Sequence, residues 1–403
     1  MKILWVKSDF LHPTTKGGQI RTLEMLRRLH ARHDVHYVGF EDRSQPEGLA
    51  RSREYCSHAY PIRHDVPSRR SLKFLGQLVA GLWSDLPVSI QRYRSTEMSE
   101  LITRLRRTEA FDAVVCDFLT PAVNMADLRR AVLFQHNVES VIWERSADQA
   151  SGPAARWYLS LQARRMRAFE AHICRAVGHI VAVSTSDATQ MRERFGVADV
   201  SEISTGVDVE YFAPREPAKP VADLIFVGSM DWLPNIDAMR FFTRQVLPLI
   251  RQLRPECSLA IVGRRPDAET LELAHHDPKI LVTGTVPDVR PFLWGSKVSI
   301  VPLRIGGGTR LKIYEAMAAR TPVVSTSIGA EGLALSSPEH FHVADTAEAF
   351  AERCVALLDD ETERRRTAVA AWNFVSSRYS WEIVARSFES ILEQAIPQGS
   401  GSK

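Results

Sequence analysis

A short segment between residues 299 and 325 places glycines directly before two cations, an order that favours an anionic ligand. Three consecutive glycines free the backbone to approach a ligand closely: Gly306, Gly307 and Gly308. Thr309 is a plausible N-cap for the helix that the apolar spacing after it predicts. Arg310 and Lys312 then bring positive charge to the positive end of the helix dipole, which is unfavourable unless a negative group binds there. The segment predicts a phosphate site, although a tight turn with a solvated basic end would use the same residues.

An acidic residue follows these cations on the predicted helix. Glu315 lies about one helical turn after Lys312. A carboxylate in this position can accept a hydrogen bond from a sugar hydroxyl, as an acidic residue does for ribose in other nucleotide sites. Together with a phosphate site, Glu315 indicates a nucleotide ligand.

A second group of polar side chains follows the apolar run that begins at Ala131. It contains four residues in close succession: Gln135, His136, Asn137 and Glu139. Polar groups at the carboxyl end of a parallel strand belong to the binding crevice of an open sheet. Considered alone, His136 is equally consistent with a buried, hydrogen-bonded structural histidine.

Both halves of the chain begin with a strand, a glycine and a helix. In the first half an apolar strand over residues 3–6 leads to Gly17 and Gly18 at the start of a helix, and a second strand follows. In the second half a strand ends at Gly228 before another helix. This βαβ order predicts parallel sheets with ligands at the carboxyl ends of their strands. The spacing of Gly17 and Gly18 lacks the full dinucleotide fingerprint.

The chain length and the prolines near residue 217 predict two domains. A chain of 403 residues is too long for one ordinary core. We expect a first domain over residues 1–204 and a second over 205–379, with a terminal amphipathic helix at about 380–395. In the first domain a strand over 179–183 is followed by a helix that we expect to be capped by Ser186 and Gly196.

Composition limits the classes of function. With 45% hydrophobic and 25% charged residues the chain reads as a globular protein, and its net charge of +3 does not favour a nucleic-acid partner. Five scattered cysteines imply neither disulfides nor structural zinc. No apolar run is long enough to span a bilayer, so we expect a cytoplasmic protein.

Two stretches combine basic and apolar residues at helical spacing. They cover residues 68–83 and 155–175. Either could bind an anionic membrane, which would bring the protein to the inner face of the cell membrane. Ordinary core helices with solvated basic ends explain the same pattern.

Several motifs of the second half are similar to those of GT-B glycosyltransferases of family 4. They are GVD at 206–208, FVGSMDWLPN at 226–235, IVG at 261–263, GTVPDVRPFL at 284–293 and EAMA at 315–318. The resemblance extends over nearly the whole chain, and GSMDW with GGGTR resembles the bacterial exopolysaccharide-associated branch in particular.

This resemblance implies an α/β fold of the GT-B type, with two doubly wound Rossmann-like domains facing across a cleft. It implies an N-terminal domain on the acceptor side, a C-terminal domain that binds the nucleotide sugar, and a C-terminal helix that crosses back to the first domain. The implied reaction is retaining, metal-independent transfer of a sugar from a UDP- or GDP-linked donor, without another cofactor. The acceptor would be a glycan, a lipid-linked molecule or a small molecule, in polysaccharide or glycoconjugate synthesis.

The resemblance also assigns the donor site. Glu315 matches the second glutamate of the family's E-x7-E motif, which binds ribose, whereas the first glutamate falls at Gly307. Backbone N–H groups of Gly307, Gly308 and Thr309 would then have to hold the donor sugar. The family's usual loop arginine and lysine are replaced by Met230 and Asn235.

The diphosphate charge would therefore fall to other cations. Arg310 and Lys312 are the expected replacements, with Arg304 as a further candidate. Val286 would hold the base through its backbone, and Arg264 would lie beside it.

The resemblance places His136 at the donor sugar, where it would position the substrate. Gly18 and Gly228 would form facing glycine loops that bind the donor, and Asn137 and Glu139 would lie on the acceptor side.

Two other functions remain open at this point. A sugar-nucleotide epimerase of the same fold would need acid and base carboxylates and no acceptor. A catalytically silent nucleotide-sugar binding protein would explain the missing glutamate and cations.

Overall fold

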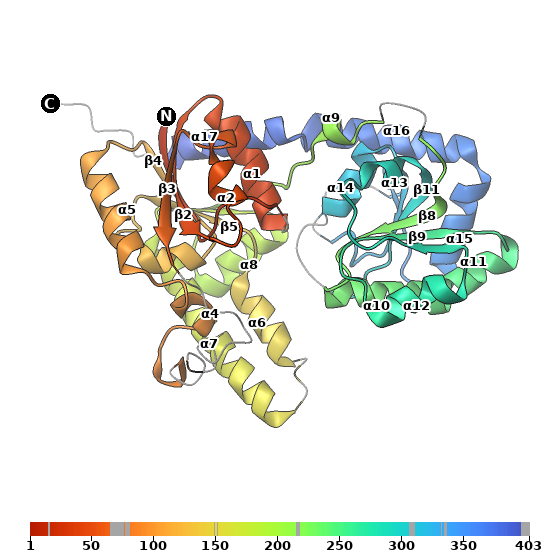
Figure 1. Ribbon diagram of the computed structural model, residues 1–403, viewed down its shortest axis with the longest axis horizontal. Coiled ribbons are helices and arrows are strands. Elements are labelled where there is room, and N and C mark those ends of the chain that lie inside the picture. Colours follow the sequence, from red (N-terminus) through yellow and green to blue (C-terminus); the bar gives the residue numbers. More distant parts are fainter. Residues whose placement is uncertain are drawn as a thin grey trace. The chain divides into compact units, whose positions relative to one another are not determined.

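The computed structural model describes residues 1–14, 17–64, 76, 81–148, 150, 152–214, 218–305, 311–331, 333 and 337–395. The chain forms two compact units (Figure 1). Unit 1 contains Met1–Ser204 together with the chain from Val384 onward, and unit 2 contains Thr205–Ile383.

Unit 1 is built on a seven-stranded sheet in the order β3-β2-β1-β4-β5-β6-β7, with parallel pairing between neighbours. Its inner strands are buried along almost their whole length, as expected for a parallel sheet covered on both faces. The sequence order reverses between β1 and β4, which is where open α/β sheets bind ligands. The strands are β1 (Lys2–Val6), β2 (Asp34–Glu41), β3 (His58–Arg63), β4 (Ala113–Asp117), β5 (Ala131–Gln135), β6 (His179–Ala182) and β7 (Val200–Glu202).

The helices of unit 1 include the long pair α6 and α7, which run together away from the sheet (Figure 1). Its α-helices are α1 (Gly17–His30), α2 (Glu47–Ala50), α4 (Val88–Gln91), α5 (Thr96–Thr108), α6 (Glu139–Asp148), α7 (Pro153–Ala176) and α8 (Thr185–Phe195). Three 3-10 turns lie at Ser52–Glu54, Gly81–Trp83 and Thr120–Asn124. The predicted N-cap of α8 was wrong: Ser184, two residues before Ser186, accepts the hydrogen bond from the backbone N–H of Asp187. The predicted C-cap is confirmed, since Gly196 adopts a left-handed conformation with φ of 65°.

The last helix, α17 (Trp381–Ala395), begins in unit 2 and belongs to unit 1 from Val384 onward. Its Phe388 is buried against Trp5 of β1 and Phe134 of β5, with ring centres 5.6 and 5.0 Å apart. Helix α17 therefore contributes to the core of the first unit.

Unit 2 repeats the architecture with six parallel strands in the order β10-β9-β8-β11-β12-β13. Here the order reverses between β8 and β11. The strands are β8 (Ala222–Val227), β9 (Leu259–Val262), β10 (Ile280–Val282), β11 (Ser296–Val301), β12 (Val323–Ser325) and β13 (His342–Val343). The α-helices are α9 (Val209–Phe212), α10 (Leu233–Phe241), α11 (Leu247–Leu253), α12 (Ala268–His276), α13 (Arg290–Trp294), α14 (Leu311–Ala318), α15 (Ala347–Asp359) and α16 (Glu361–Arg378), and a π-helical turn at Phe242–Val246 joins α10 to α11.

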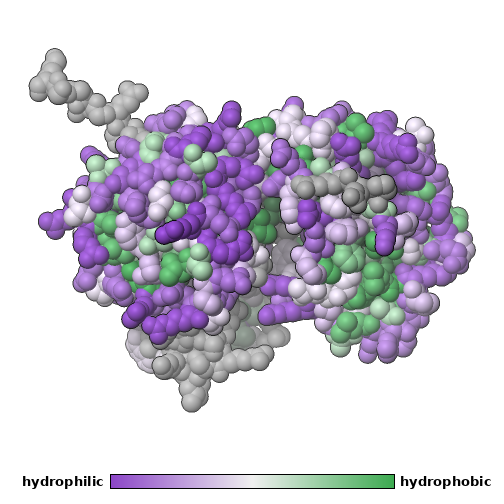
Figure 2. Space-filling model, turned by 45° about the horizontal axis from the view of Figure 1, so that its top comes forward, coloured by the Kyte–Doolittle hydropathy of each residue, from purple (hydrophilic) through white to green (hydrophobic). Residues whose placement is uncertain are grey.

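The surface is mixed in character. On the face seen in Figure 2, small groups of hydrophobic residues lie among hydrophilic ones in both units. Within the described part of the chain, no helix has both the length and the apolar character required to cross a membrane.

Candidate functional site

A buried carboxylate marks the carboxyl end of β4. Asp117 is fully buried, and its Oδ2 accepts hydrogen bonds from Trp5 Nε1 at 2.9 Å, Lys7 Nζ at 3.1 Å and Thr22 Oγ1 at 2.7 Å. Its Oδ1 lies 2.8 Å from His136 Nε2. Burial alone would raise the pKa of Asp117, but the charge of Lys7 and the contacts with His136 and Thr22 outweigh it and hold this pKa below its ordinary value. Asp117 is therefore a fixed negative charge at the point where the strand order reverses.

His136 lies directly behind this carboxylate and has both ring nitrogens engaged. Arg21 donates to Nδ1 at 2.9 Å, so the ring proton is on Nε2 and is donated to Asp117. The ring stacks on Phe118, with centres 3.8 Å apart and planes 6° apart. Burial lowers the pKa of His136 to about 3, and Arg21 opposes protonation further, so the ring is neutral near pH 7. His136 can hold its neighbours in place, but it has no free nitrogen with which to take a proton.

Gly18, in the first turn of α1, provides the space that this stack requires. A Cβ atom at Gly18 would lie 2.4 Å from the Phe118 ring and 3.7 Å from His136 Nδ1. Phe118 itself has a positive φ of 71°, which is unusual for a bulky residue. A side chain at position 18 would therefore displace the Phe118 ring from its stack on His136. The structure thus places the two predicted residues, Gly18 and His136, close together.

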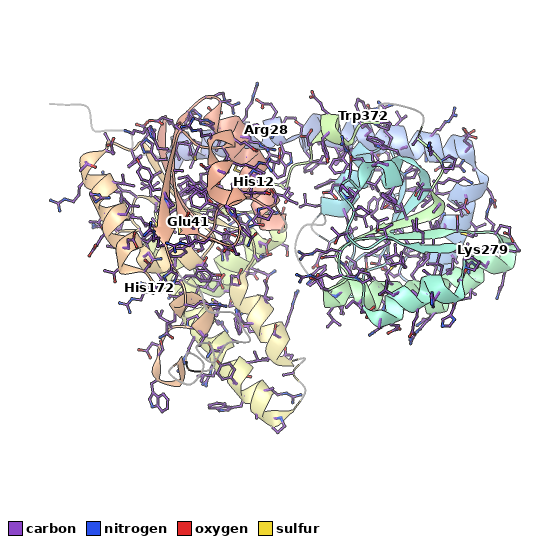
Figure 3. The ribbon with its side chains drawn as sticks, viewed as in Figure 1. His12, Arg28, Glu41, His172, Lys279 and Trp372 are labelled. Carbon is purple, nitrogen blue, oxygen red and sulfur yellow. The ribbon has the colours of Figure 1, made fainter. Side chains whose placement is uncertain are left out.

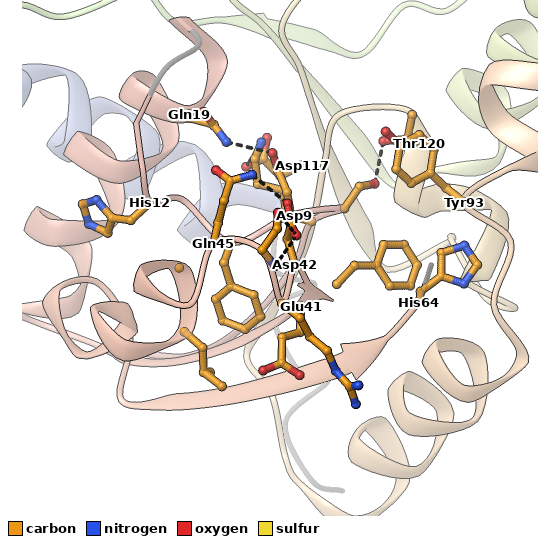
Figure 4. Close-up of a pocket in the computed structure, with 18 of the residues that line it drawn as sticks. Asp9, His12, Gln19, Glu41, Asp42, Gln45, His64, Tyr93, Asp117 and Thr120 are labelled. Carbon is orange, nitrogen blue, oxygen red and sulfur yellow. Dashed lines mark hydrogen bonds and ion pairs between the residues drawn. The ribbon is translucent and has the colours of Figure 1, made fainter. Parts of the chain in front are cut away.

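A pocket of about 700 Å³ opens at the carboxyl ends of β1, β2 and β4 (Figure 4). Gly18, Lys7, Asp117 and Phe118 are among the residues that line it. The predicted residues His136, Asn137 and Glu139 are not among the described lining residues. The pocket thus lies in front of Asp117, and His136 lies one layer behind.

Glu139 and Asn137 follow β5 as the sequence indicated, at the start of α6. Glu170 of α7 accepts hydrogen bonds there from the backbone N–H groups of Glu139 and Ser140, both at 2.8 Å, and from Gln135 Nε2 at 3.0 Å. Burial, followed by repulsion from Glu170, raises the pKa of Glu139 to about 7. Sequence reasoning missed Glu170, because the residues it binds are about thirty positions away in the chain.

In unit 2 the structure brings Gly228 and Lys312 into contact. Gly228 follows β8, and a Cβ atom there would lie 2.9 Å from Lys312 Nζ and 2.8 Å from Asn235 Nδ2. Lys312 donates to Asn235 Oδ1 at 2.9 Å, and its Nζ lies 4.3 Å from the centre of the Phe226 ring. The ammonium group is thereby held against a bare stretch of backbone at the point where the strand order of unit 2 reverses.

Glu315 lies one turn further along α14 and is half-buried. Burial raises the pKa of its carboxyl group to about 7, and the charge of Lys312 only partly counteracts this. Among the described residues, none forms a hydrogen bond or an ion pair with this carboxylate. A polar group in such surroundings is available to a ligand.

The other predicted donor-site residues differ in their surroundings. Arg264 Nε donates to Ser229 Oγ at 2.6 Å, and Val286 is half-buried against the core of unit 2. Arg304 pairs with Asp237 through two hydrogen bonds of 2.6 and 3.0 Å, so its charge is already balanced. Four predicted residues lie outside the described part of the chain: Gly307, Gly308, Thr309 and Arg310.

One group of described residues has the ligand types and spacing to hold a metal ion: Asp34, His36 and His58. Asp34 and His58 begin β2 and β3, so the group lies at the amino ends of the strands. The pocket lies at the opposite, carboxyl ends. This group is therefore separate from the site described above.

Comparison with known proteins agrees with this architecture. The family model described as Glycosyltransferase Family 4 matches residues 15–211, and the model described as Glycosyl transferases group 1 matches residues 222–360. An uncharacterised 44.6 kDa protein of the cps region of Klebsiella pneumoniae is 21% identical, over 98% of this chain and 99% of that protein.

A second relative and a solved structure extend the comparison. The phosphatidyl-myo-inositol mannosyltransferase of Mycobacterium tuberculosis is 31% identical over 56% of this chain, and the match spans 61% of that protein. The crystal structure of Anabaena HepE in complex with UDP and glucose covers 98% of this chain and 99% of its own, with a TM-score of 0.67 and 13% identity. Two doubly wound sheets and two adjoining family matches lead to one conclusion: the chain belongs to glycosyltransferase family 4 and is a glycosyltransferase with the GT-B fold.

Proposed function

We propose that this enzyme transfers a sugar from a UDP- or GDP-linked donor to an acceptor hydroxyl with retention of configuration, in bacterial polysaccharide or glycoconjugate synthesis. The observation that carries the proposal is the position of Lys312 Nζ, 2.9 Å from where a Cβ atom at Gly228 would lie. Glu315 is one helical turn away, and its carboxylate has no hydrogen-bond or ion-pair partner among the described residues. A cation beside exposed backbone suits a phosphate, and a nearby carboxylate suits a ribose.

In this proposal the nucleotide binds at the reversal of strand order in unit 2. Lys312 and the predicted Arg310 stabilise the departing diphosphate, together with backbone N–H groups of Gly307, Gly308 and Thr309. Glu315 accepts hydrogen bonds from the ribose. Val286 and Arg264 lie toward the base. The cations and amides stabilise the negative charge that develops on the departing diphosphate, so the proposed reaction needs neither a metal nor another cofactor.

His136 is proposed as a positioning residue beside the donor sugar. Its two engaged nitrogens suit it to fix the surrounding side chains, and we expect His136→Ala to lower turnover with little loss of nucleotide affinity. For a retaining reaction the acceptor hydroxyl attacks from the side of the leaving group and can give its proton to the departing diphosphate. Transfer with retention of configuration then requires no base from the protein. Unchanged turnover in His136→Ala would contradict this role.

The acceptor is proposed to bind in the pocket of unit 1. The pocket lies at the carboxyl ends of β1, β2 and β4, and it adjoins Gly18 and Phe118. Asn137 and Glu139, at the start of α6, are proposed to contact more distant parts of the acceptor. A glycan, a lipid-linked molecule or a small molecule would each present hydroxyl groups to this surface.

We also propose that α7 contacts an anionic membrane. Trp157 near its start is 60% exposed, and Trp83 of the adjacent turn is 81% exposed. Arg165 of α7 donates to the carbonyl oxygen of Gly81 and so holds this turn against the helix. Exposed tryptophans with nearby arginines suit the interface of an anionic bilayer. Most of the other predicted membrane stretch, residues 68–83, lies outside the described residues.

The decisive experiment is a scan of donor turnover across UDP-, GDP- and ADP-sugars with the full chain. Release of the nucleoside diphosphate together with a glycosylated product supports the transferase. Conversion of the donor sugar without any acceptor would favour an epimerase. Tight nucleotide binding without turnover of any donor would favour the silent binding protein and overturn the proposal.

A further inference from the structure

The pocket of unit 1 has one wall made of aromatic rings. Phe40 of β2 stacks on His64 with ring centres 4.5 Å apart and on Tyr93 with ring centres 6.2 Å apart. Phe10 lines the pocket as well. Figure 4 shows His64 and Tyr93 on the same side of the cavity. A concave, partly apolar surface of this kind suits the face of a ring-shaped ligand.

Three carboxylates also line the pocket: Asp9, Glu41 and Asp42. Two of these carboxylates, Asp9 and Asp42, already accept hydrogen bonds from other groups of the protein. Asp9 Oδ2 accepts from Gln19 Nε2 at 2.9 Å, and Asp42 accepts from the backbone N–H of Ser44 at 2.9 Å. These bonds fix where the negative charge lies.

Glu41 is the acidic group left open to a ligand. It is the last residue of β2 and is half-buried. Within the part of the chain that the structure describes, its carboxylate has neither a hydrogen-bond donor nor an ion-pair partner. Its two oxygens can each accept a hydrogen bond from a hydroxyl group in the pocket.

The described cations of the pocket do not cancel this charge. Lys7 lies 3.1 Å from Asp117 and is neutralised by it. Burial, followed by the charge of Arg51, lowers the pKa of His12, which keeps this ring neutral near pH 7. Arg43 is exposed to solvent. Among the described lining residues, carboxylates therefore outnumber the cations that remain available.

We propose that this pocket selects a neutral sugar ring of the acceptor, with hydroxyls donating to Glu41 and Asp9 and the ring lying against the aromatic wall, and that it rejects sugars bearing carboxylate or phosphate. The inference rests on the proposed transferase function and adds the class of acceptor. The diphosphate of a nucleotide or of a lipid-linked acceptor lies outside this pocket, because the carboxylates would repel it.

Binding of two matched probes to the full chain tests the selection. Methyl α-glucoside and methyl α-glucuronide share the same ring, and the second carries a carboxylate. We expect saturation-transfer NMR to give a dissociation constant at least about tenfold lower for the glucoside, because like charges repel in a partly buried pocket. Equal affinities, a preference for the glucuronide, or no binding of either probe would overturn the inference.

Charge variants identify the residue responsible. Glu41→Gln should lower the ratio of the two affinities by at least about threefold, since it removes one negative charge. Glu41→Asp keeps the charge and should keep most of the ratio. Glu47→Gln is the matched control, because Glu47 is exposed at the start of α2 and is not a described lining residue. The same ratio in Glu41→Gln and Glu47→Gln would refute the role of Glu41.

Donor turnover measured in the same preparations separates the two proposals. Turnover of a UDP- or GDP-sugar without discrimination between the probes would refute the acceptor class alone. Discrimination between the probes without turnover of any donor would refute the transferase proposal alone.

Discussion

His136 Nε2 lies 2.8 Å from Asp117 Oδ1, and both side chains are buried at the carboxyl ends of neighbouring strands. The bond joins the histidine that the sequence indicated to a carboxylate that it did not. On its other side Asp117 binds Lys7, which follows β1. The ends of three adjacent strands are thus linked by charged and polar side chains.

Asp117→Asn should destabilise unit 1. The substitution leaves the buried ammonium of Lys7 without a counter-charge, which costs about 3–5 kcal/mol for a broken buried ion pair. Hydrogen exchange of the β1 and β4 amides measures this loss in unit 1 itself. Asp148→Asn, at the exposed end of α6, is the control and should change stability by less than about 0.5 kcal/mol. Equal protection in the two variants would show that Lys7 does not depend on Asp117.

His136 should lower the stability of unit 1 as the pH falls from 7 to 5, whereas Glu139, whose pKa is raised to about 7, acts in the opposite direction. The pKa of His136 in the folded protein, about 3, lies below the ordinary value of about 6.5. At this histidine the unfolded chain therefore binds a proton in this range that the folded chain does not, which lowers stability as the pH falls. Asp117 does not contribute here, because a carboxylate with a lowered pKa loses stability only below about pH 4.

His136→Gln should remove the contribution of this ring, so the variant should lose less stability than wild type, or gain more, when the pH falls from 7 to 5. Denaturant unfolding at pH 7 and pH 5 gives the difference for wild type and variant. His172→Gln is the control, since His172 lies exposed on α7 (Figure 3). His172→Gln should behave as wild type, and the same change in stability in wild type and His136→Gln would contradict the assignment.

The sequence contained enough to predict the layers of the fold and the ends of the strands where polar groups gather. Apolar runs followed by glycine located β1 and β8, and the cluster after β5 located His136. The same reasoning could have predicted Asp117 as a site residue. An acid that ends a buried run, beside a lysine that ends the neighbouring strand, is a recognisable pair once the parallel order is assumed.

Other partners could not be predicted, because they depend on how helices dock. Arg21 reaches His136, and Thr22 reaches Asp117, only because of the rotation of α1 about its axis, which the sequence does not give. Glu170 reaches the start of α6 from α7 for a similar reason. The pairing of Arg304 with Asp237 likewise depends on the position of α10.

Lys312→Met should weaken binding of UDP or GDP by about 1–3 kcal/mol, the range of a charge-assisted hydrogen bond. The ammonium held against Gly228 is lost, whereas methionine keeps most of the volume. Isothermal titration calorimetry with the free nucleotides measures the change. The control is Lys297→Met. Lys297 lies at the start of β11, away from the glycine loops, and its ammonium pairs with Asp223 of β8, so this substitution should leave the affinity unchanged. Equal affinities in the two variants would place the diphosphate elsewhere.

Glu315→Gln should weaken nucleotide binding and stabilise unit 2 at the same time. The folded-state pKa of Glu315, about 7, is raised above its ordinary value of 4.5, so the ionised group opposes folding increasingly as the pH rises from about 4.5 through 7. Glutamine stays neutral, and the variant should melt higher than wild type at pH 8 but not at pH 4. The lost acceptor for ribose should lower UDP or GDP affinity by about 1–3 kcal/mol.

Glu272→Gln, exposed on α12, carries the same change of charge and should alter neither quantity. Thermal melting at the two pH values and calorimetry with the nucleotide separate the two effects of Glu315. A gain in stability without loss of affinity would mean that its carboxylate is buried without serving the ligand. A loss of affinity without a pH-dependent gain would mean that a partner balances its charge. We expect both changes, because the Glu315 carboxylate has no partner among the described residues and is proposed to gain one, a ribose hydroxyl, when the nucleotide binds.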